Sequence, residues 1–229
     1  MNPELSLAIP IYNEEDCIED TVKNLVNEFE KQGIDYEMVL VNHGSVDKTK
    51  NILDKLSKDN KKLKVINLAK NLNGAGGGVM YGLDISKGRY MGFTYADEEV
   101  SAEDTYRIYL ALKKSGYDFA KGKRLKRKDG LIRIISSIVF NVIVNLIFNL
   151  HSIDVNGYPV FMKREIYPKL KTKETNYLFT LDILRRARRN KYKILEIPVI
   201  HRKRIGGISF MKPARIIEMA IKLFKYSIK

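Results

Sequence analysis

The chain has 229 residues, 45% of them apolar, so it can bury a full core, and one large domain of sandwich or α/β type is the simplest organisation. Cys17 is the only cysteine, which excludes a disulfide within the chain, and the N-terminus lacks a basic, apolar signal sequence, so we expect a protein that is cytoplasmic or faces the cytosol. The net charge of +14 is uneven, since residues 1–120 carry 15 Lys/Arg and 20 Asp/Glu, whereas residues 121–229 carry 26 and 7.

The first two predicted strands each end in a polar loop. Unbroken apolar runs begin at Leu5 and Met38, and such runs are typical of strands buried on both faces of a parallel sheet. The loops that follow, at residues 12–15 and 42–47, carry carboxylates. In open α/β sheets ligands bind at the carboxyl ends of the strands, so we expect these loops to line one site.

Strands and helices alternate over the first half of the chain. Hydrophobic periodicity predicts strands at residues 5–10, 36–42, 63–68, 90–95 and 117–121. It predicts helices near residues 15–31, 47–58, 76–86 and 101–115. Gly33 after the first helix and the capping box that starts at Ser101 support these boundaries. The alternation predicts an α/β fold whose central sheet is parallel over its first part.

Residues 131–150 form an apolar stretch with a narrow polar stripe on a predicted helix. The polar side chains recur at every fourth position: Ser137, Asn141, Asn145 and Asn149. The length would permit a membrane span, but the asparagines and Arg133 argue against a free-standing one. We therefore expect either a helix in the plane of a membrane interface or one that is buried or forms a dimer.

The last segment, residues 213–229, predicts a second amphipathic helix. It begins with Pro213, and its basic side chains lie opposite an apolar face. This apolar face would pack on the sheet or contact a membrane, and the pattern fits both equally well.

Three carboxylates follow the predicted fourth strand directly, at Asp97, Glu98 and Glu99. Hard oxygen ligands at the end of a strand suit a Mg²⁺ or Mn²⁺ ion that bridges a diphosphate. Acidic residues also favour the first turn of a helix because they interact with its dipole, and this second explanation involves no ligand. The cluster by itself leaves both explanations open.

Two further patterns are candidates for phosphate binding. The glycine run at residues 74–78 either cradles a phosphate or permits a close approach of the backbone to another element. The basic clusters at residues 121–128 and 201–204 contain arginines, whose guanidinium groups suit phosphate oxygens. The basic second half therefore indicates phosphate groups, nucleic acid or an acidic membrane surface as a partner, unless it is only a solvated surface rich in lysine.

In combination, the motifs resemble those of the family 2 glycosyltransferases of the GT-A fold, particularly the dolichyl- or polyprenyl-phosphate sugar synthase-like branch. Six segments are similar to family motifs and occur in the same order: Pro10 to Glu14, Val41 to Asp47, Tyr95 to Asp97, Gly122 to Arg124, Asp154 to Gly157 and Arg204 to Ser209. Each motif is weak alone, but six in order are specific. The resemblance implies a GT-A domain over residues 1–212, with a mostly parallel sheet flanked by helices, followed by the amphipathic helix of residues 213–229.

The resemblance also implies an activity. The enzyme would transfer a sugar, with inversion, from a nucleotide-sugar to a lipid phosphate, and it would be peripheral on the cytosolic face of the membrane. A lipid phosphate oxygen needs little deprotonation to attack, so positioning, a divalent metal and arginines would suffice without a strong general base.

The motifs imply specific roles for residues of this chain. Nucleotide-sugar binding is implied for Pro10, Tyr12, Asn13, Glu14, His43, Tyr95, Ala96 and Asp97. The Mg²⁺ or Mn²⁺ ligands would be Asp97 and Glu99. Phosphates of the donor or acceptor would be bound by Arg124, Arg133, Arg204 and Ser209, and the catalytic residues would be Asp97, Arg124 and Arg204.

Two residues depart from the family pattern. His43 replaces the usual aspartate of the nucleotide loop, which changes how the base and ribose are recognised. Tyr95 replaces the first aspartate of the D-x-D motif, so Asp97 would bind metal more weakly, bind it together with Glu98 or Glu99, or not bind it. Some family 2 relatives resemble this chain more closely at these positions, which indicates a divergent subgroup.

Other functions are compatible with the same motifs. A family 2 enzyme with a glycan or glycolipid acceptor would carry them, and so would a catalytically impaired homologue that binds nucleotide-sugar or membrane. Attachment would be peripheral or through a membrane partner protein, and the chain could form a homodimer. Nucleic acid is disfavoured because the basic clusters contain few aromatic residues and match no known binding module.

Overall fold

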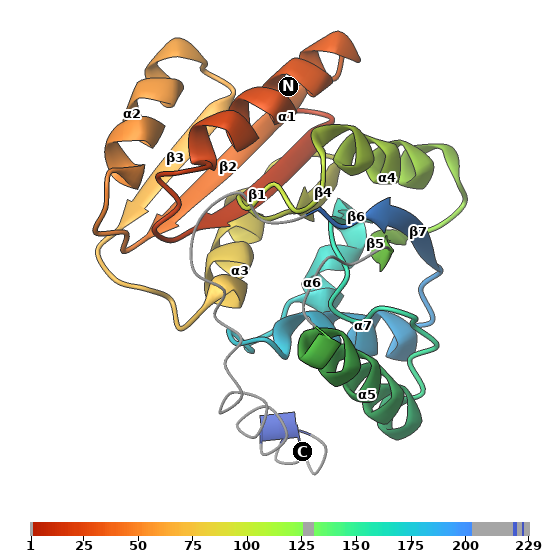
Figure 1. The fold of residues 1–229 in the computed structure, drawn as a ribbon. Coiled ribbons are helices and arrows are strands. Elements are labelled where there is room, and N and C mark those ends of the chain that lie inside the picture. The colour runs from red at the N-terminus through yellow and green to blue at the C-terminus, as the bar shows by residue number, and fades with distance from the viewer. Residues whose placement is uncertain (1, 126–130, 203–221, 224–225, 227–229) are drawn as a thin grey trace.

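Over the residues that the structure describes, the chain forms one seven-stranded sheet with helices on both faces (Figure 1). The structure is a computed structural model that describes residues 2–125, 131–202, 222, 223 and 226, with only the backbone of residues 131–133. The strands are β1 (Leu5–Ile11), β2 (Tyr36–His43), β3 (Leu63–Leu68), β4 (Tyr90–Phe93), β5 (Phe119–Leu125), β6 (Val160–Lys163) and β7 (Ile194–Ile200). The helices are α1 (Ile18–Lys31), α2 (Thr49–Asp59), α3 (Ala75–Ile85), α4 (Ala102–Lys114), α5 (Leu131–Phe148), α6 (Tyr167–Leu170) and α7 (Phe179–Arg189).

The sheet has the strand order β3-β2-β1-β4-β6-β5-β7. Neighbours among β1 to β4 are parallel, which confirms the prediction for the first part of the sheet. Strand β6 is antiparallel to both β4 and β5, and β5 is parallel to β7. The predicted strands and helices of the first half are all present, with small shifts at their ends, whereas β6, α6, α7 and β7 are not predicted.

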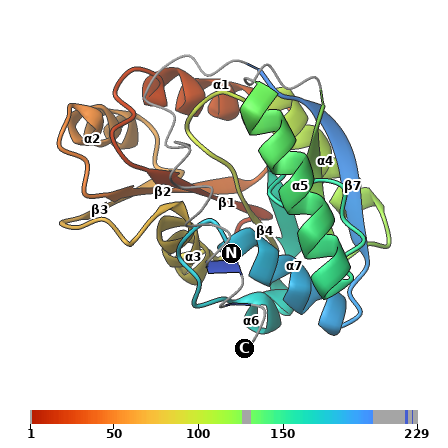
Figure 2. The same cartoon turned by 60° about the horizontal axis from the view of Figure 1, so that its bottom comes forward.

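Helices cover both faces of the sheet (Figure 2). Helices α1, α2 and α4 pack on one face, around a core cluster that contains Leu7, Ile9 and Phe29. Helices α3, α6 and α7 pack on the other face, around a second cluster that contains Ala8 and Val79. Successive residues of β1 thus face opposite clusters, which explains why this strand is an unbroken apolar run.

Helix α5 lies at the surface, and one of its sides is apolar and exposed. The exposed residues are Ile135, Ile138, Val139, Val142, Ile143, Leu146 and Ile147. Leu146 is 80% exposed, whereas Val144 on the opposite side of the helix is fully buried. This side of α5 is therefore not covered by the described residues, and the interfacial and dimer-forming alternatives stay predictions. Within the described ranges, no helix is both long enough and apolar enough to cross a membrane.

The described residues near the C-terminus pack on the second core cluster. Leu223 and Tyr226 are buried there, and the Tyr226 hydroxyl donates a hydrogen bond to Asp182 in α7. The Tyr226 ring meets Phe148 of α5 edge-on, with 5.6 Å between ring centroids. At these two residues the apolar side of the segment faces the protein. The rest of the predicted helix at residues 213–229 lies outside the described residues.

Candidate active site

The polar loops after β1 and β2 lie against each other. The backbone N–H of Asn13 donates to Ser45 Oγ at 2.9 Å, and the side-chain oxygen of Asn13 accepts from the N–H of Val46 at 2.9 Å. The N–H of Glu14 donates to Thr49 Oγ1 at 2.9 Å. Asn13 has a positive φ of 54°, a conformation that asparagine adopts more readily than most residues. The two loops therefore form one connected edge at the carboxyl ends of β1 and β2.

His43 is buried at this edge between an aromatic ring and a glycine. Its ring stacks on that of Tyr12, with 5.9 Å between centroids. A Cβ atom at Gly78 would come within 2.8 Å of Pro10 Cβ and 3.0 Å of His43 Cδ2, so Gly78 permits a close approach of α3. Burial lowers the pKa of His43 and outweighs a contact with the Asn71 side chain, which raises it, so the imidazole is neutral at pH 7. Its Nδ1 is buried and has no hydrogen-bond partner among the described residues.

Asp97 and Glu99 are buried just beyond the end of β4. The N–H of Glu99 donates to Asp97 Oδ1 at 3.2 Å. Glu99 Oε2 accepts a hydrogen bond from the Tyr158 hydroxyl at 2.7 Å and lies 3.0 Å from His201 Nε2. The carboxylate expected to bind metal beside Asp97 is thus in contact with two protein side chains.

The metal ligands that the described residues offer are few. In the part of the chain that the structure describes, no group of three His, Cys, Asp or Glu side chains comes together as a metal site. Asp97 is a carboxylate at a strand end, which fits a hard cation whose other ligands come from a diphosphate and water. Glu99 fits this role less well, because its Oε2 already contacts Tyr158 and His201.

Tyr95, at the position of the first D-x-D aspartate, makes an aromatic contact instead. Its ring meets that of Tyr158 edge-on, with 4.6 Å between centroids and 83° between the planes. Burial and, to a smaller extent, the charge of Asp97 raise the pKa of Tyr95, so its phenol is neutral at pH 7. Tyr95 therefore does not restore the negative charge that the missing aspartate would supply.

Arg124 forms a buried ion pair with Asp154. Its Nε and Nη2 donate to the two carboxylate oxygens, each at 2.8 Å, and its backbone N–H donates to Asp154 Oδ2 at 3.1 Å. Both side chains are 8% exposed. Burial alone would raise the pKa of Asp154, but the bonds from Arg124 outweigh it and lower the pKa to about 2. The guanidinium also lies 5.8 Å from the centre of the Tyr158 ring, whose hydroxyl binds Glu99.

Cys17 connects the first loop to the acidic segment. Its thiol is buried and donates to the carbonyl oxygen of Ala96 at 3.0 Å, and its Sγ lies 3.3 Å from Glu14 Oε2. The hydroxyl of Thr21 in α1 donates to the same carbonyl at 3.2 Å. The ends of β1, β2 and β4 therefore belong to one continuous edge.

Most of the predicted site residues lie at this edge. They are Pro10, Tyr12, Asn13, Glu14, His43, Tyr95, Ala96, Asp97, Glu99 and Arg124. The side chain of Arg133 and all of Arg204 and Ser209 lie outside the described residues. Sequence reasoning assigned no role to Asp154, Tyr158 and His201. Only their positions in the sequence could have indicated a role. Asp154 begins a motif that resembles a family motif, Tyr158 directly follows that motif, and His201 begins a basic cluster.

Sequence comparison gives three informative relatives. The sequence model of a family described as glycosyl transferase family 2 matches residues 6–194. A poly(ribitol-phosphate) beta-glucosyltransferase of Bacillus spizizenii is 27% identical over 178 residues, which are 78% of this chain and 24% of that protein. A dodecaprenyl-phosphate galacturonate synthase of Rhizobium johnstonii is 29% identical over 63% of this chain and 43% of that protein. An undecaprenyl-phosphate 4-deoxy-4-formamido-L-arabinose transferase of Pectobacterium atrosepticum is 25% identical over 96% of this chain and 66% of that protein.

The chain therefore spans between 24% and 66% of the length of these relatives. Among solved structures, this chain resembles glucosyl-3-phosphoglycerate synthase from Mycobacterium tuberculosis, with a TM-score of 0.73 and 14% sequence identity. The match covers 98% of this chain and 80% of the mycobacterial chain. For the same enzyme in complex with Mn²⁺, uridine diphosphate and phosphoglyceric acid, the match covers 99% of this chain and 77% of the mycobacterial chain, with a TM-score of 0.72 and 16% sequence identity. At these identities the likeness concerns the fold, which is that of the GT-A glycosyltransferases.

Proposed function

The chain belongs to glycosyl transferase family 2, and we propose that it transfers a sugar from a nucleotide-sugar to a polyprenyl or dolichyl phosphate, with inversion at the anomeric carbon. One observation carries the proposal: the loops after β1 and β2 lie at the same edge of the sheet as the buried side chains of Asp97 and Arg124. Edges of this kind bind ligands in open α/β sheets. Two relatives that are named for dodecaprenyl and undecaprenyl phosphate support the lipid acceptor.

The nucleotide of the donor would lie on the first two loops. The stacked rings of Tyr12 and His43 offer an aromatic surface for the base. The buried Nδ1 of His43 would gain a hydrogen bond from the base or ribose, which removes the cost of leaving it unpaired. Asp97 would hold Mg²⁺ or Mn²⁺ at the diphosphate, and such a cation would supply positive charge to stabilise the leaving group. The Mn²⁺ and uridine diphosphate bound by the mycobacterial enzyme support this arrangement.

The proposed transfer requires little proton chemistry. An oxygen of the acceptor phosphate attacks the anomeric carbon, the bond from that carbon to the diphosphate oxygen breaks, and the nucleoside diphosphate leaves. The attacking oxygen is already anionic at neutral pH, so the site needs no strong general base. Nη1 of Arg124 takes no part in the pair with Asp154 and would donate to a phosphate oxygen. Orientation and fixed charge would then supply the catalysis.

A transfer assay with two classes of acceptor tests the proposal. We expect label from a UDP- or GDP-sugar to enter the organic phase when the protein is incubated with divalent metal and polyprenyl phosphate. Label on a glycan or glycolipid instead would identify the alternative family 2 activity. Thermal stabilisation by a nucleoside diphosphate, without transfer to any acceptor, would identify a catalytically impaired homologue that binds nucleotide-sugar.

Helix α5 is the proposed contact with the cytosolic face of the membrane. A shallow groove of about 520 Å³ on its exposed side is lined by Ile138, Asn141, Val142, Asn145, Leu146 and Ile153. Basic α7 lies at the end of the helix, where Arg188 Nε donates to the carbonyl of Leu150 at 2.6 Å. An apolar helix side next to basic residues fits a bilayer with acidic headgroups. Attachment would be peripheral or assisted by a membrane partner protein, and a homodimer is the competing use of this surface.

Replacing Ile138 and Leu146 together by serine is expected to lower binding to anionic liposomes about tenfold, because two large apolar side chains no longer enter the bilayer. Liposome flotation measures the bound fraction. The matched control is Val46→Ser, which removes an 87% exposed apolar side chain from the loop after β2 and should leave flotation unchanged. If the double variant floats like the wild type, α5 is not the membrane contact. Conversion of a dimer to a monomer in lipid-free buffer would assign the surface to a homodimer.

A further inference from the structure

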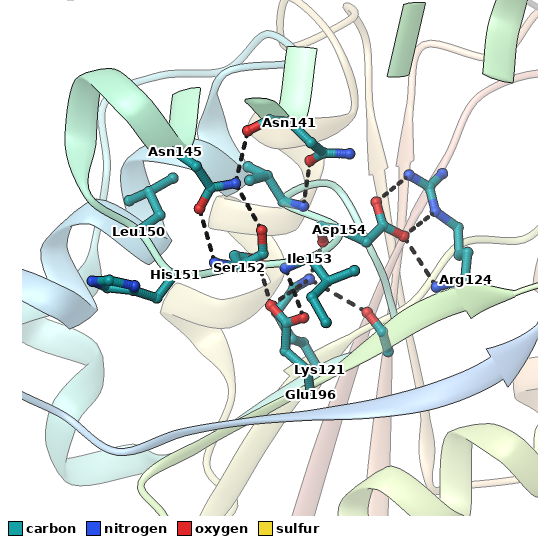
Figure 3. A network of polar contacts seen from close by, with 12 residues as sticks. Lys121, Arg124, Asn141, Asn145, Leu150, His151, Ser152, Ile153, Asp154 and Glu196 are labelled. Atoms are coloured by element: carbon teal, nitrogen blue, oxygen red, sulfur yellow. Dashed lines mark hydrogen bonds and ion pairs between the residues drawn. The ribbon is translucent and has the colours of Figure 1, made fainter. Parts of the chain in front are cut away.

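The polar stripe of α5 holds the loop that leads from α5 to β6 (Figure 3). Oδ1 of Asn145 accepts from the N–H of Ser152 at 2.9 Å, and its Nδ2 donates to the Ser152 carbonyl at 2.7 Å. One helical turn earlier, Asn141 Oδ1 accepts from the N–H of Val155 at 2.9 Å. The two asparagines thus fix the backbone on both sides of Asp154.

Two charged side chains hold the same loop from the sheet. Glu196 in β7 accepts from the Ser152 hydroxyl and from the N–H of Ile153, the latter at 3.0 Å. Lys121 in β5 is fully buried, and its Nζ donates to the carbonyl of Asp154 and lies 3.8 Å from Glu196 Oε1. Arg188 in α7 donates to the carbonyls of Leu150 and His151, so side chains of four elements, α5, β5, β7 and α7, bind the loop.

These contacts lead to Arg124. Asp154 accepts hydrogen bonds from three nitrogens of Arg124, the backbone N, Nε and Nη2. The cations Lys121 and Arg124 and the anions Asp154 and Glu196 belong to one network in which the formal charges cancel, and all of these side chains but that of the partly exposed Glu196 are buried. Because Asp154 binds two side-chain nitrogens of Arg124, the direction of the guanidinium depends on where the loop places Asp154.

We propose that Asn145, with the support of Asn141, is a positioning residue for the sugar transfer. It fixes the loop at Ser152 so that Asp154 directs Arg124 toward the reacting phosphate. The inference rests on the proposed function, because it gives Arg124 a phosphate to bind. Asn145 acts through Ser152 and Asp154 and needs no contact with substrate.

Loss of the Asn145 amide would leave the backbone N–H and carbonyl of Ser152 without their side-chain partner. Unpaired buried polar groups are unfavourable, so the loop would shift to satisfy them elsewhere. Asn149 and His151 have positive φ values of 50° and 49°, and Ser152 belongs to no helix or strand whose backbone hydrogen bonds would resist such a shift. In enzymes, a misplacement of about 1 Å can lower the rate by about a hundredfold.

The test variant is Asn145→Leu, which has nearly the same shape and cannot form these hydrogen bonds. The matched control is Tyr226→Phe, which removes another buried side-chain hydrogen bond, that to Asp182, at a site outside the loop. We expect Asn145→Leu to lower kcat about tenfold or more, with the donor KM within about twofold of the wild type. The control should change neither constant.

A second readout does not require transfer. In protein with ¹⁵N-labelled arginine, the Nε–H signal of Arg124, assigned with Arg124→Lys, should exchange slowly with solvent because it is buried against Asp154. In Asn145→Leu this exchange should be at least about tenfold faster, and in Tyr226→Phe it should be unchanged.

The outcomes separate the two proposals. Unchanged kcat and unchanged exchange of the Arg124 signal in Asn145→Leu would overturn the positioning role. Equal losses of kcat in Asn145→Leu and Tyr226→Phe would also overturn it, because they would reveal only a general loss of stability. If the wild-type protein transfers no sugar, the proposed function fails. The exchange of the Arg124 signal then still decides whether Asn145 positions Arg124.

Discussion

Replacing Asp97 by alanine is expected to lower the rate of sugar transfer at least about a hundredfold without unfolding the protein. Asp97 is 9% exposed and is the remaining carboxylate of the D-x-D position, because Tyr95 occupies the first place. Tyr95 is neutral at pH 7, and Glu99 is in contact with Tyr158 and His201, so neither offers an equivalent ligand for the donor diphosphate and its metal.

The initial rate at saturating donor, together with the melting temperature, measures the effect of Asp97→Ala. Glu103→Ala is the matched control, because it removes an exposed carboxylate from the first turn of α4 and should keep the wild-type rate. Calorimetric titration of Mn²⁺ with a nucleoside diphosphate should give heat beyond that of the protein-free titration with the wild type and no such excess with Asp97→Ala. A rate within about threefold of the wild type would mean that Asp97 does not act on the donor diphosphate.

Much of the first half of the fold is predictable because β1, β2 and β4 are buried on both faces. In β1, Leu7 and Ile9 face one core cluster and Ala8 faces the other, so the run is continuous and distinct from the helices around it. The loops after neighbouring parallel strands share one edge, which is why the polar loops indicated a site. Strand β6, Val160–Lys163, is as short as β4 but lies outside the regular alternation of strands and helices, and much of β7, Ile194–Ile200, is only half-buried.

The second half of the candidate site depends on contacts between distant segments. Tyr158 reaches Glu99 from the segment before β6, and His201 reaches it from just beyond β7. No local periodicity indicates such pairs. The stripe that includes Asn141 and Asn145 is visible in the sequence, but its partner is a loop whose position depends on β5, β7 and α7. A pattern on a helix defines a face, and only the packed structure shows what that face binds.

Replacing Asp154 by asparagine is expected to destabilise the protein by about 3–5 kcal/mol, because it leaves the buried Arg124 without the carboxylate that binds its Nε and Nη2. Urea unfolding measures the change. Asp54→Asn is the control, since Asp54 pairs with Lys50 on the surface at 2.9 Å, and such pairs change stability by at most about 0.5 kcal/mol. Equal urea midpoints for Asp154→Asn and the wild type would contradict the buried pair.

The same pair makes stability depend on pH. Although burial opposes it, Arg124 lowers the pKa of Asp154 from 3.8 to about 2 in the folded protein. A carboxyl with a lower pKa in the folded than in the unfolded state stabilises the fold above the unfolded pKa, and this contribution is lost as the pH falls toward the folded pKa. This shift in the pKa of Asp154 corresponds to a contribution of about 2 kcal/mol to the free energy of unfolding. The free energies of unfolding of the wild type and Asp154→Asn should therefore converge by that amount between about pH 5 and pH 2. A difference that stays constant over this range would show that Asp154 is not held as a carboxylate by Arg124.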